Sequence, residues 1–300
     1  MWLAVKHQAG VALMIFMALA GQGVAKEPKA AALFASVDAP SSQLPEPIGD
    51  YSKGCGAGMV ELPETGPTWQ AMRLSRNRNW GQPVLVDYLE ELSAAATQIG
   101  WRGLYIGDLA QPRGGPSESG HLSHQSGLDA DVWYLPPARL DLSLGEREEI
   151  SANSVRTEDQ LRVNENWTEA HHQLLKAAAS DARVDRIFVA AAIKIEMCKT
   201  ATPKDKKWLQ RIRPIYGHND HFHVRLKCPD GASACVTQKP TVAELSNGGD
   251  GCDETLTWWV TDYLEELKHP PKDKGPKKRG PRDYVMADLP KACMGVLQSD

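Results

Sequence analysis

The sequence predicts an α+β fold in which helices flank a central antiparallel sheet. Two observations support this fold class: some segments repeat apolar residues at helical spacing, and others alternate apolar and polar residues as half-buried strands do. The 300 residues have the ordinary composition of a globular protein and show no internal repeat. We therefore expect one folded domain, which we assign to residues 51–300.

The clearest helical segment runs from about Pro83 to Ile99. Pro83 suits the first turn of a helix, apolar residues then recur every three or four positions, and Gly100 suits the end. A second helix is expected to begin near Thr168. Shorter helices are expected at residues 193–197, 206–212 and 255–267.

Two strand-like segments alternate apolar and polar side chains: residues 127–134 and 221–226. In the first, Asp129 and Asp131 share the polar face, and in the second His221 and His223 share it. Pairing of these strands in one sheet would bring both polar faces to a common cleft. Further strands are expected at residues 104–106 and 186–190.

The first 25 residues have the features of a secretory signal peptide. Lys6 precedes an apolar run at residues 9–20, and small residues at 23–25 offer a cleavage site. Because the run is shorter than the roughly 20 apolar residues that span a bilayer, we expect no stable membrane anchor after cleavage. Residues 26–50, rich in alanine, proline and serine, are expected to form an extended lead-in to the domain.

The charge of the chain gives little indication of its partners. The formal net charge of −4 is modest and no basic stripe stands out, which argues against a nucleic-acid partner. Residues 270–282 are rich in proline and lysine and are expected to form an exposed loop within the domain.

Six cysteines lie after the predicted cleavage site: Cys55, Cys198, Cys228, Cys235, Cys252 and Cys293. In a secreted protein an even number of cysteines predicts disulfides, and the lack of a CxxC pair argues against a cysteine zinc site. Six cysteines allow 15 pairings. Cys228 and Cys235 are close enough in sequence to close a small loop, so we expect that pair first.

Five of the nine histidines fall in two short windows: His121 and His124 in the first, and His218, His221 and His223 in the second. Catalytic zinc sites use three protein ligands, often histidine and carboxylate, and keep a fourth position for water. Two histidines with Asp131 satisfy this rule. One histidine of the second strand can then bind the metal while the other reaches the water or the substrate, so the spacing predicts a zinc hydrolase.

Some roles in this cluster stay open from the residues alone. Asp129 is an alternative ligand or a carboxylate that orients a histidine, and Asp220 is a candidate to orient His218. His171 and His172 are expected to be ordinary hydrogen-bonded helix residues. A serine nucleophile is disfavoured because no GxSxG motif is present, and the HExxH helix of many zinc peptidases is also absent from the sequence.

The HxxxxxxD spacing from His124 to Asp131, followed by His221-Phe222-His223, resembles the lysostaphin/D-Ala-D-Ala-carboxypeptidase/hedgehog-like metallopeptidases. Within that group, the segments SGHLSHQSGLDADVW, RIFVAAAIK, RIRP and HNDHFHVRLKCP resemble the penicillin-insensitive murein endopeptidases. The resemblance extends from about residue 51 to residue 293.

This resemblance implies roles for particular residues. His124, Asp131 and His223 match the zinc ligands, and His221 matches the histidine beside the reacting water. Two further histidines match residues that line the site, His121 and His218. Some relatives bind a second metal through the counterpart of His121, but the loop at residues 156–167 has no histidine to complete such a site here.

The resemblance also implies disulfides and a function. The disulfides would be Cys55–Cys293, Cys198–Cys252 and Cys228–Cys235. The function would be that of a periplasmic zinc endopeptidase, which hydrolyses D-alanyl–meso-diaminopimelyl cross-links in peptidoglycan and is insensitive to penicillin. The alternatives are a zinc D,D-carboxypeptidase that trims terminal D-alanine and a non-catalytic murein-binding protein that contains zinc. The additional histidines argue against the second alternative, because a purely structural zinc does not need them.

Overall fold

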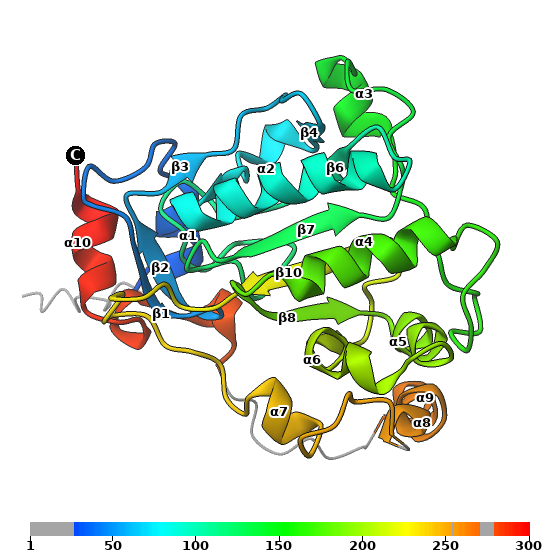
Figure 1. Ribbon diagram of the computed structural model, residues 1–300. Helices are drawn as coiled ribbons and strands as arrows, with labels where there is room; N and C mark the ends of the chain where they lie inside the picture. Colours follow the sequence, from blue (N-terminus) through cyan, green and yellow to red (C-terminus); the bar gives the residue numbers. More distant parts are fainter. Residues whose placement is uncertain (1–26, 254, 271–278) are drawn as a thin grey trace, which may run out of the picture.

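The computed structural model describes residues 27–253, 255–270 and 279–300 (Figure 1). The predicted signal peptide lies outside the described residues, as does most of the predicted loop at 270–282. None of the described helices is both long and apolar enough to cross a membrane.

A six-stranded sheet forms the centre of the structure, in the order β4, β6, β7, β10, β8, β9. The four inner strands pair antiparallel, as predicted, whereas both edge strands pair parallel with their neighbours. The strands are β4 (Trp69–Ala71), β6 (Leu104–Ile106), β7 (Asp129–Trp133), β10 (His221–Leu226), β8 (Val184–Val189) and β9 (Ile212–Pro214).

Two long helices, α2 (Pro83–Gln98) and α4 (Glu169–Ser180), cover one face of this sheet (Figure 1). Both begin within a residue of the predicted starts. Their apolar sides pack on the fully buried apolar face of the strands, which includes Val132 and Phe222. The side-chain alternation of β7 and β10 therefore directs the acidic and histidine side chains to the opposite face of the sheet.

Shorter helices surround the sheet. The predicted helix at 206–212 is wrong in its second half: α6 ends at Leu209, and Ile212 pairs with Ile187 as a fully buried residue of edge strand β9. The predicted helix at 255–267 is divided at Thr261, whose backbone is not helical. These helices are α3 (Leu144–Glu149), α5 (Ala191–Cys198), α6 (Lys206–Leu209), α7 (Val242–Leu245), α8 (Thr255–Val260) and α9 (Asp262–Lys268).

The lead-in predicted for residues 26–50 is wrong. It contains helix α1 (Ala30–Ala35) and strand β1 (Glu46–Asp50), which pairs antiparallel with β2 (Lys53–Ala57). Phe34 of α1 is buried in a small apolar cluster with residues of β1, β2 and the C-terminal helix α10 (Ala292–Gln298). The first and last described segments thus pack together beside the main sheet (Figure 1). A further small pair joins β3 (Val60–Glu61) and β5 (Trp80–Gly81).

All six cysteines form disulfides, in the pairs that the family resemblance implied: Cys55–Cys293, Cys198–Cys252 and Cys228–Cys235. The first connects β2 to α10, and the second connects the end of α5 to the segment before α8. The third closes the short loop after β10, which was the pair expected from sequence separation alone.

Candidate metal centre

Asp131 and His223 are direct neighbours across the β7–β10 pair. Both strands are antiparallel and in register at this point, so the two side chains project to the same face of the sheet. His223 Nδ1 lies 3.3 Å from Asp131 Oδ1. The predicted pairing of β7 with β10 is therefore confirmed. The polar side chains of the two strands also lie together on one face of the sheet, as predicted.

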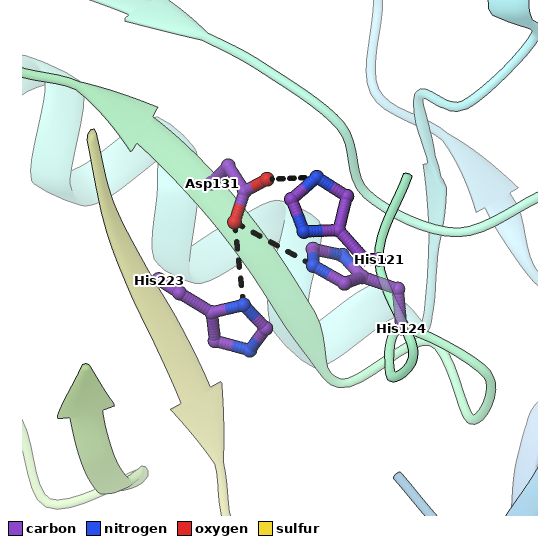
Figure 2. A group of neighbouring side chains, drawn as sticks. All are labelled: His121, His124, Asp131 and His223. Carbon is purple, nitrogen blue, oxygen red and sulfur yellow. Dashed lines mark ion pairs between the residues drawn. The ribbon is translucent and has the colours of Figure 1, made fainter. Parts of the chain in front are cut away.

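The loop before β7 carries His121 and His124 over the start of that strand (Figure 2). His124 has a left-handed backbone, with φ of 69°, and its N–H donates to Asp129 Oδ2 at 3.1 Å. This hydrogen bond turns the loop back on the strand. His124 Nε2 consequently lies 3.5 Å from Asp131 Oδ1, while His121 Nε2 lies 2.9 Å from the other carboxylate oxygen.

These four side chains fit a metal ion. One candidate ligand atom from each of His121, His124, Asp131 and His223 lies within 4.8 Å of the others. Tetrahedral zinc with bonds of 2.0–2.2 Å separates its ligand atoms by about 3.3–3.6 Å. The distances from Asp131 Oδ1 to the facing nitrogens of His124 and His223, 3.5 and 3.3 Å, match this separation.

Several polar atoms at this centre are buried without a hydrogen-bond partner. They include both ring nitrogens of His124, Oδ1 of Asp131 and Nε2 of His221. A buried polar atom that lacks a partner costs about 1–3 kcal/mol, so native structures rarely leave several together. A cation bound at this centre would give several of these buried nitrogen and oxygen atoms a partner. Among the described residues, no second group of three or more potential ligands comes together.

The titration behaviour of the ligand candidates also suits a metal. Burial lowers the pKa of His124 to about 4, so its imidazole is neutral at pH 7. Burial would raise the pKa of Asp131, but His221, His121 and His124 hold it well below its usual range. Burial would lower the pKa of His223, but Asp129 and Asp131 raise it to about 8, so a metal ion would displace a proton there.

The sequence left Asp129 as either a metal ligand or a carboxylate that orients a histidine. Its contacts in the structure fit the orienting role. Its carboxylate is fully buried and accepts hydrogen bonds from Arg225 Nε and Nη2, both at 2.8 Å. Its Oδ2 also lies 3.3 Å from His223 Nε2, which leaves the Nδ1 of that ring facing Asp131. Burial would raise the pKa of Asp129, but Arg225 and His223 hold it well below its usual range.

His221 lies beside the four ligand candidates. Its Nδ1 donates to Asp220 Oδ1 at 2.7 Å, and its Nε2 lies 3.7 Å from Asp131 Oδ1. The idea that Asp220 orients His218 is therefore wrong, because its carboxylate is bonded to the adjacent His221. Burial would lower the pKa of His221, but the carboxylates of Asp131 and Asp220 raise it.

His218 approaches the same region from the turn before β10. Its ring centre is 5.0 Å from that of His221 and 5.9 Å from that of His223. Its Nδ1 lies 3.1 Å from the carbonyl oxygen of Tyr216, to which it donates. Burial, with smaller contributions from His221 and His223, lowers the pKa of His218 to about 3. His218 is therefore a neutral, oriented imidazole at pH 7.

Other histidines have the structural roles that the sequence suggested. His171 is buried in α4, where its Nδ1 accepts from the backbone N–H of Thr168 at 3.1 Å. Its Nε2 lies 2.8 Å from the carbonyl oxygen of Tyr134, to which it donates. His172 packs edge-on against Trp208.

A cavity of about 230 Å³ beside the centre is lined partly by residues that were not predicted from the sequence. The cavity is lined by His121, Asp131 and His221, and also by Arg73, Arg76 and Asp108. Asp108 is a single acid after a short apolar strand, so no local pattern marks it. The closely spaced arginines of RLSRNR, residues 73–78, were the one available signal.

A His/Asp centre on a sheet, open to a cavity, defines a candidate metal-dependent hydrolase. The sequence model of the family described as penicillin-insensitive murein endopeptidase matches residues 47–298. The chain belongs to this family, which is a family of metallopeptidases. The resemblance recognised from the sequence motifs is thereby confirmed.

Individual relatives match nearly the whole chain. It is 41% identical over 261 residues to the penicillin-insensitive murein endopeptidase of Haemophilus influenzae, covering 84% of this chain and 82% of that protein. It is 33% identical over 287 residues to the protein of that name from Klebsiella pneumoniae, covering 96% of each. A namesake from Yersinia pestis is 34% identical over 260 residues, covering 87% of this chain and 88% of that protein.

Proposed function

We propose that this protein is a periplasmic zinc endopeptidase that hydrolyses the amide between D-alanine and meso-diaminopimelate in peptidoglycan cross-links. The observation that carries the proposal is the convergence of unpartnered buried histidine and aspartate atoms on a cavity. The relatives, which are named murein endopeptidases, support peptidoglycan as the substrate class. The particular cross-link is the one that the resemblance of the sequence motifs implies. The signal peptide predicted at residues 1–25 supports the location.

His124, Asp131 and His223 would hold the zinc ion, with His121 as a further candidate ligand. Nitrogen and carboxylate donors in this number are typical of catalytic zinc. When bound, zinc would supply Lewis-acid polarisation of the scissile carbonyl and make a coordinated water more acidic. Asp129 supports the ligands by holding the His124 backbone and facing His223 Nε2.

His221 is the proposed proton acceptor. Because its Nδ1–H donates to Asp220, the neutral form of the ring has its lone pair at Nε2, which lies 3.7 Å from Asp131 Oδ1 beside the cavity. It would accept a proton at Nε2 from the attacking water and return it to the leaving amine. His218, neutral and adjacent, would support the orientation of His221. No serine is acylated in this scheme, so β-lactams would have no nucleophile to trap.

The proposal can be tested with purified zinc-loaded protein and cross-linked muropeptide dimers. We expect the wild-type protein to convert dimers to monomers and a chelator to stop the reaction. His223→Ala should lose both bound zinc and activity, whereas His221→Ala should keep zinc but lose most turnover. His269→Ala, at the exposed end of α9, serves as the control. Intact dimers after incubation with the zinc-loaded wild-type protein would refute the endopeptidase function.

The same assay separates the alternatives. A D,D-carboxypeptidase would release terminal D-alanine from monomeric pentapeptides and leave dimers intact. A non-catalytic murein-binding protein would retain zinc and change neither substrate. The unpartnered Nε2 of His221 beside the cavity argues against a purely structural centre.

A further inference from the structure

The cavity beside the metal centre has two chemically different walls. His121, Asp131 and His221 form one wall, and Arg73 and Arg76 contribute to the other. The first wall belongs to the metal centre and the proton acceptor already described. The second wall has no role in the proposed proton transfer, although it faces the same space.

Arg76 has hydrogen-bonding capacity to spare. Its side chain is 47% exposed, and only Nη1 is engaged, at 3.2 and 3.1 Å from the two oxygens of Asp108. Neither Nε nor Nη2 of Arg76 has a hydrogen-bond partner among the described residues. Arg78 Nη1 also donates to Asp108, at 3.0 Å. One buried carboxylate is thus shared by two guanidinium groups, which leaves an excess of positive charge at Arg76.

Arg73 adds a second, fixed positive charge. Within the described part of the chain, its guanidinium donates only to the backbone carbonyl groups of Arg147 and Ile150. Its central carbon lies 5.5 Å from the ring centre of Trp133. The carbonyl oxygens orient this guanidinium without forming an ion pair. Glu148 interacts electrostatically with both arginines, but its two oxygens accept hydrogen bonds from Ser75 and it does not line the cavity. The arginine wall therefore favours a negatively charged group in the cavity.

Asp108 places this wall close to the metal centre. Its Oδ2 lies 3.1 Å from Arg76 Nη1 and 3.8 Å from His121 Nε2, and His121 is itself 2.9 Å from Asp131. The remaining acid that lines the cavity, Asp220, accepts a hydrogen bond from His221. Arg76 is therefore close enough to the metal centre to contact an anionic group of a bound ligand, provided that this group lies next to the reacting carbonyl.

We propose that Arg76, assisted by Arg73, binds the carboxylate of the residue on the amine side of the scissile amide. This inference rests on the proposed function and specifies its substrate class. In a D-alanyl–diaminopimelyl cross-link, only the amide nitrogen and one carbon separate that carboxylate from the scissile carbonyl carbon. The free Nε and Nη2 of Arg76 form the planar fork that binds a carboxylate through two hydrogen bonds.

The test compares two cross-linked dimers that differ only at this carboxylate, which is free in one and amidated in the other. We expect the zinc-loaded wild-type protein to cleave the free-acid dimer with a kcat/KM roughly ten- to a hundredfold higher, the worth of a charged hydrogen bond. Arg76→Gln should lose this preference, so that the two dimers are cleaved at similar rates. Arg76→Lys keeps the positive charge but lacks the planar pair of donors, so it should keep part of the preference for the free-acid dimer.

Controls separate binding from folding and from the proposed function. Arg162→Gln changes an exposed arginine outside the cavity and should retain the wild-type ratio. Hydrolysis of the amidated dimer by Arg76→Gln, with normal zinc content, shows that this variant is folded. Equal cleavage of both dimers by the wild-type protein, or an unchanged ratio in Arg76→Gln, would overturn the inference and leave the proposed function intact. Failure of the wild-type protein to cleave either dimer would refute both.

Discussion

Asp129→Asn is the substitution that best separates support of the metal centre from metal ligation. The carboxylate of Asp129 accepts two hydrogen bonds from the buried Arg225, one from the backbone of His124, and faces His223. The amide has almost the same shape, so the change removes the charge and one acceptor while keeping the packing. The guanidinium of Arg225 would then be left buried without its anion.

The size of the effect follows from these contacts. Removal of one partner of a buried ion pair costs about 3–5 kcal/mol of unfolding free energy. Arg225 would keep its contact with Gln238 and its position 4.1 Å over the ring of Tyr51, so we expect the lower end, about 3 kcal/mol. For a chain of this size that loss lowers Tm by about 6–12 °C. Misorientation of His124 and His223 should weaken zinc binding about 10- to 100-fold.

Urea unfolding and a zinc competition titration measure the two effects. Asp87→Asn is the matched control, because Asp87 is exposed on α2 and its side chain makes no hydrogen bond or ion pair with the described residues. A variant that still binds zinc, but more weakly, agrees with the orienting role. Unchanged stability and unchanged zinc affinity in Asp129→Asn would refute the reasoning.

Further predictions concern stability and the metal. Replacing Cys55 and Cys293 by alanine should lower the unfolding free energy by roughly 5 kcal/mol in urea, because this disulfide spans 238 residues. Gly114→Ala should lower Tm, because a Cβ there would lie 1.9 Å from the carbonyl oxygen of Gln125 in a left-handed backbone with φ of 62°. Phe222→Ala should cost about 3–5 kcal/mol through the cavity left in the core, measured by urea unfolding. A chelator should lower both Tm and activity, and added zinc should restore them.

The periodicity of apolar residues correctly predicted the helices and strands that bury one face in the core. Helix α2 and strands β7 and β10 each have one apolar face, and that face packs in the core as expected. Alternation placed Asp131 and His223 on the polar faces of two predicted strands. They could therefore be proposed as metal ligands before the pairing of these strands was known. The disulfide pairing, by contrast, required the family resemblance.

The remaining features depend on contacts between segments far apart in sequence. Residues 26–50 were predicted to be extended because they are rich in alanine, proline and serine. Phe34 is nevertheless buried in a cluster with the C-terminal helix, which local composition cannot reveal. Ile212 continued a helical pattern and instead pairs with β8. The link from Arg76 through Asp108 to His121 joins three separate segments, so it emerges only when the chain is folded.

The position of the cleaved bond tests the proposed endopeptidase function most directly. A cross-linked dimer can be digested in ¹⁸O-labelled water by the zinc-loaded protein, and the products identified by mass spectrometry. Hydrolysis of the proposed amide would place one ¹⁸O atom in the new carboxylate of D-alanine and none in the diaminopimelyl product. Label in any other residue, or intact dimers, would contradict the proposed function.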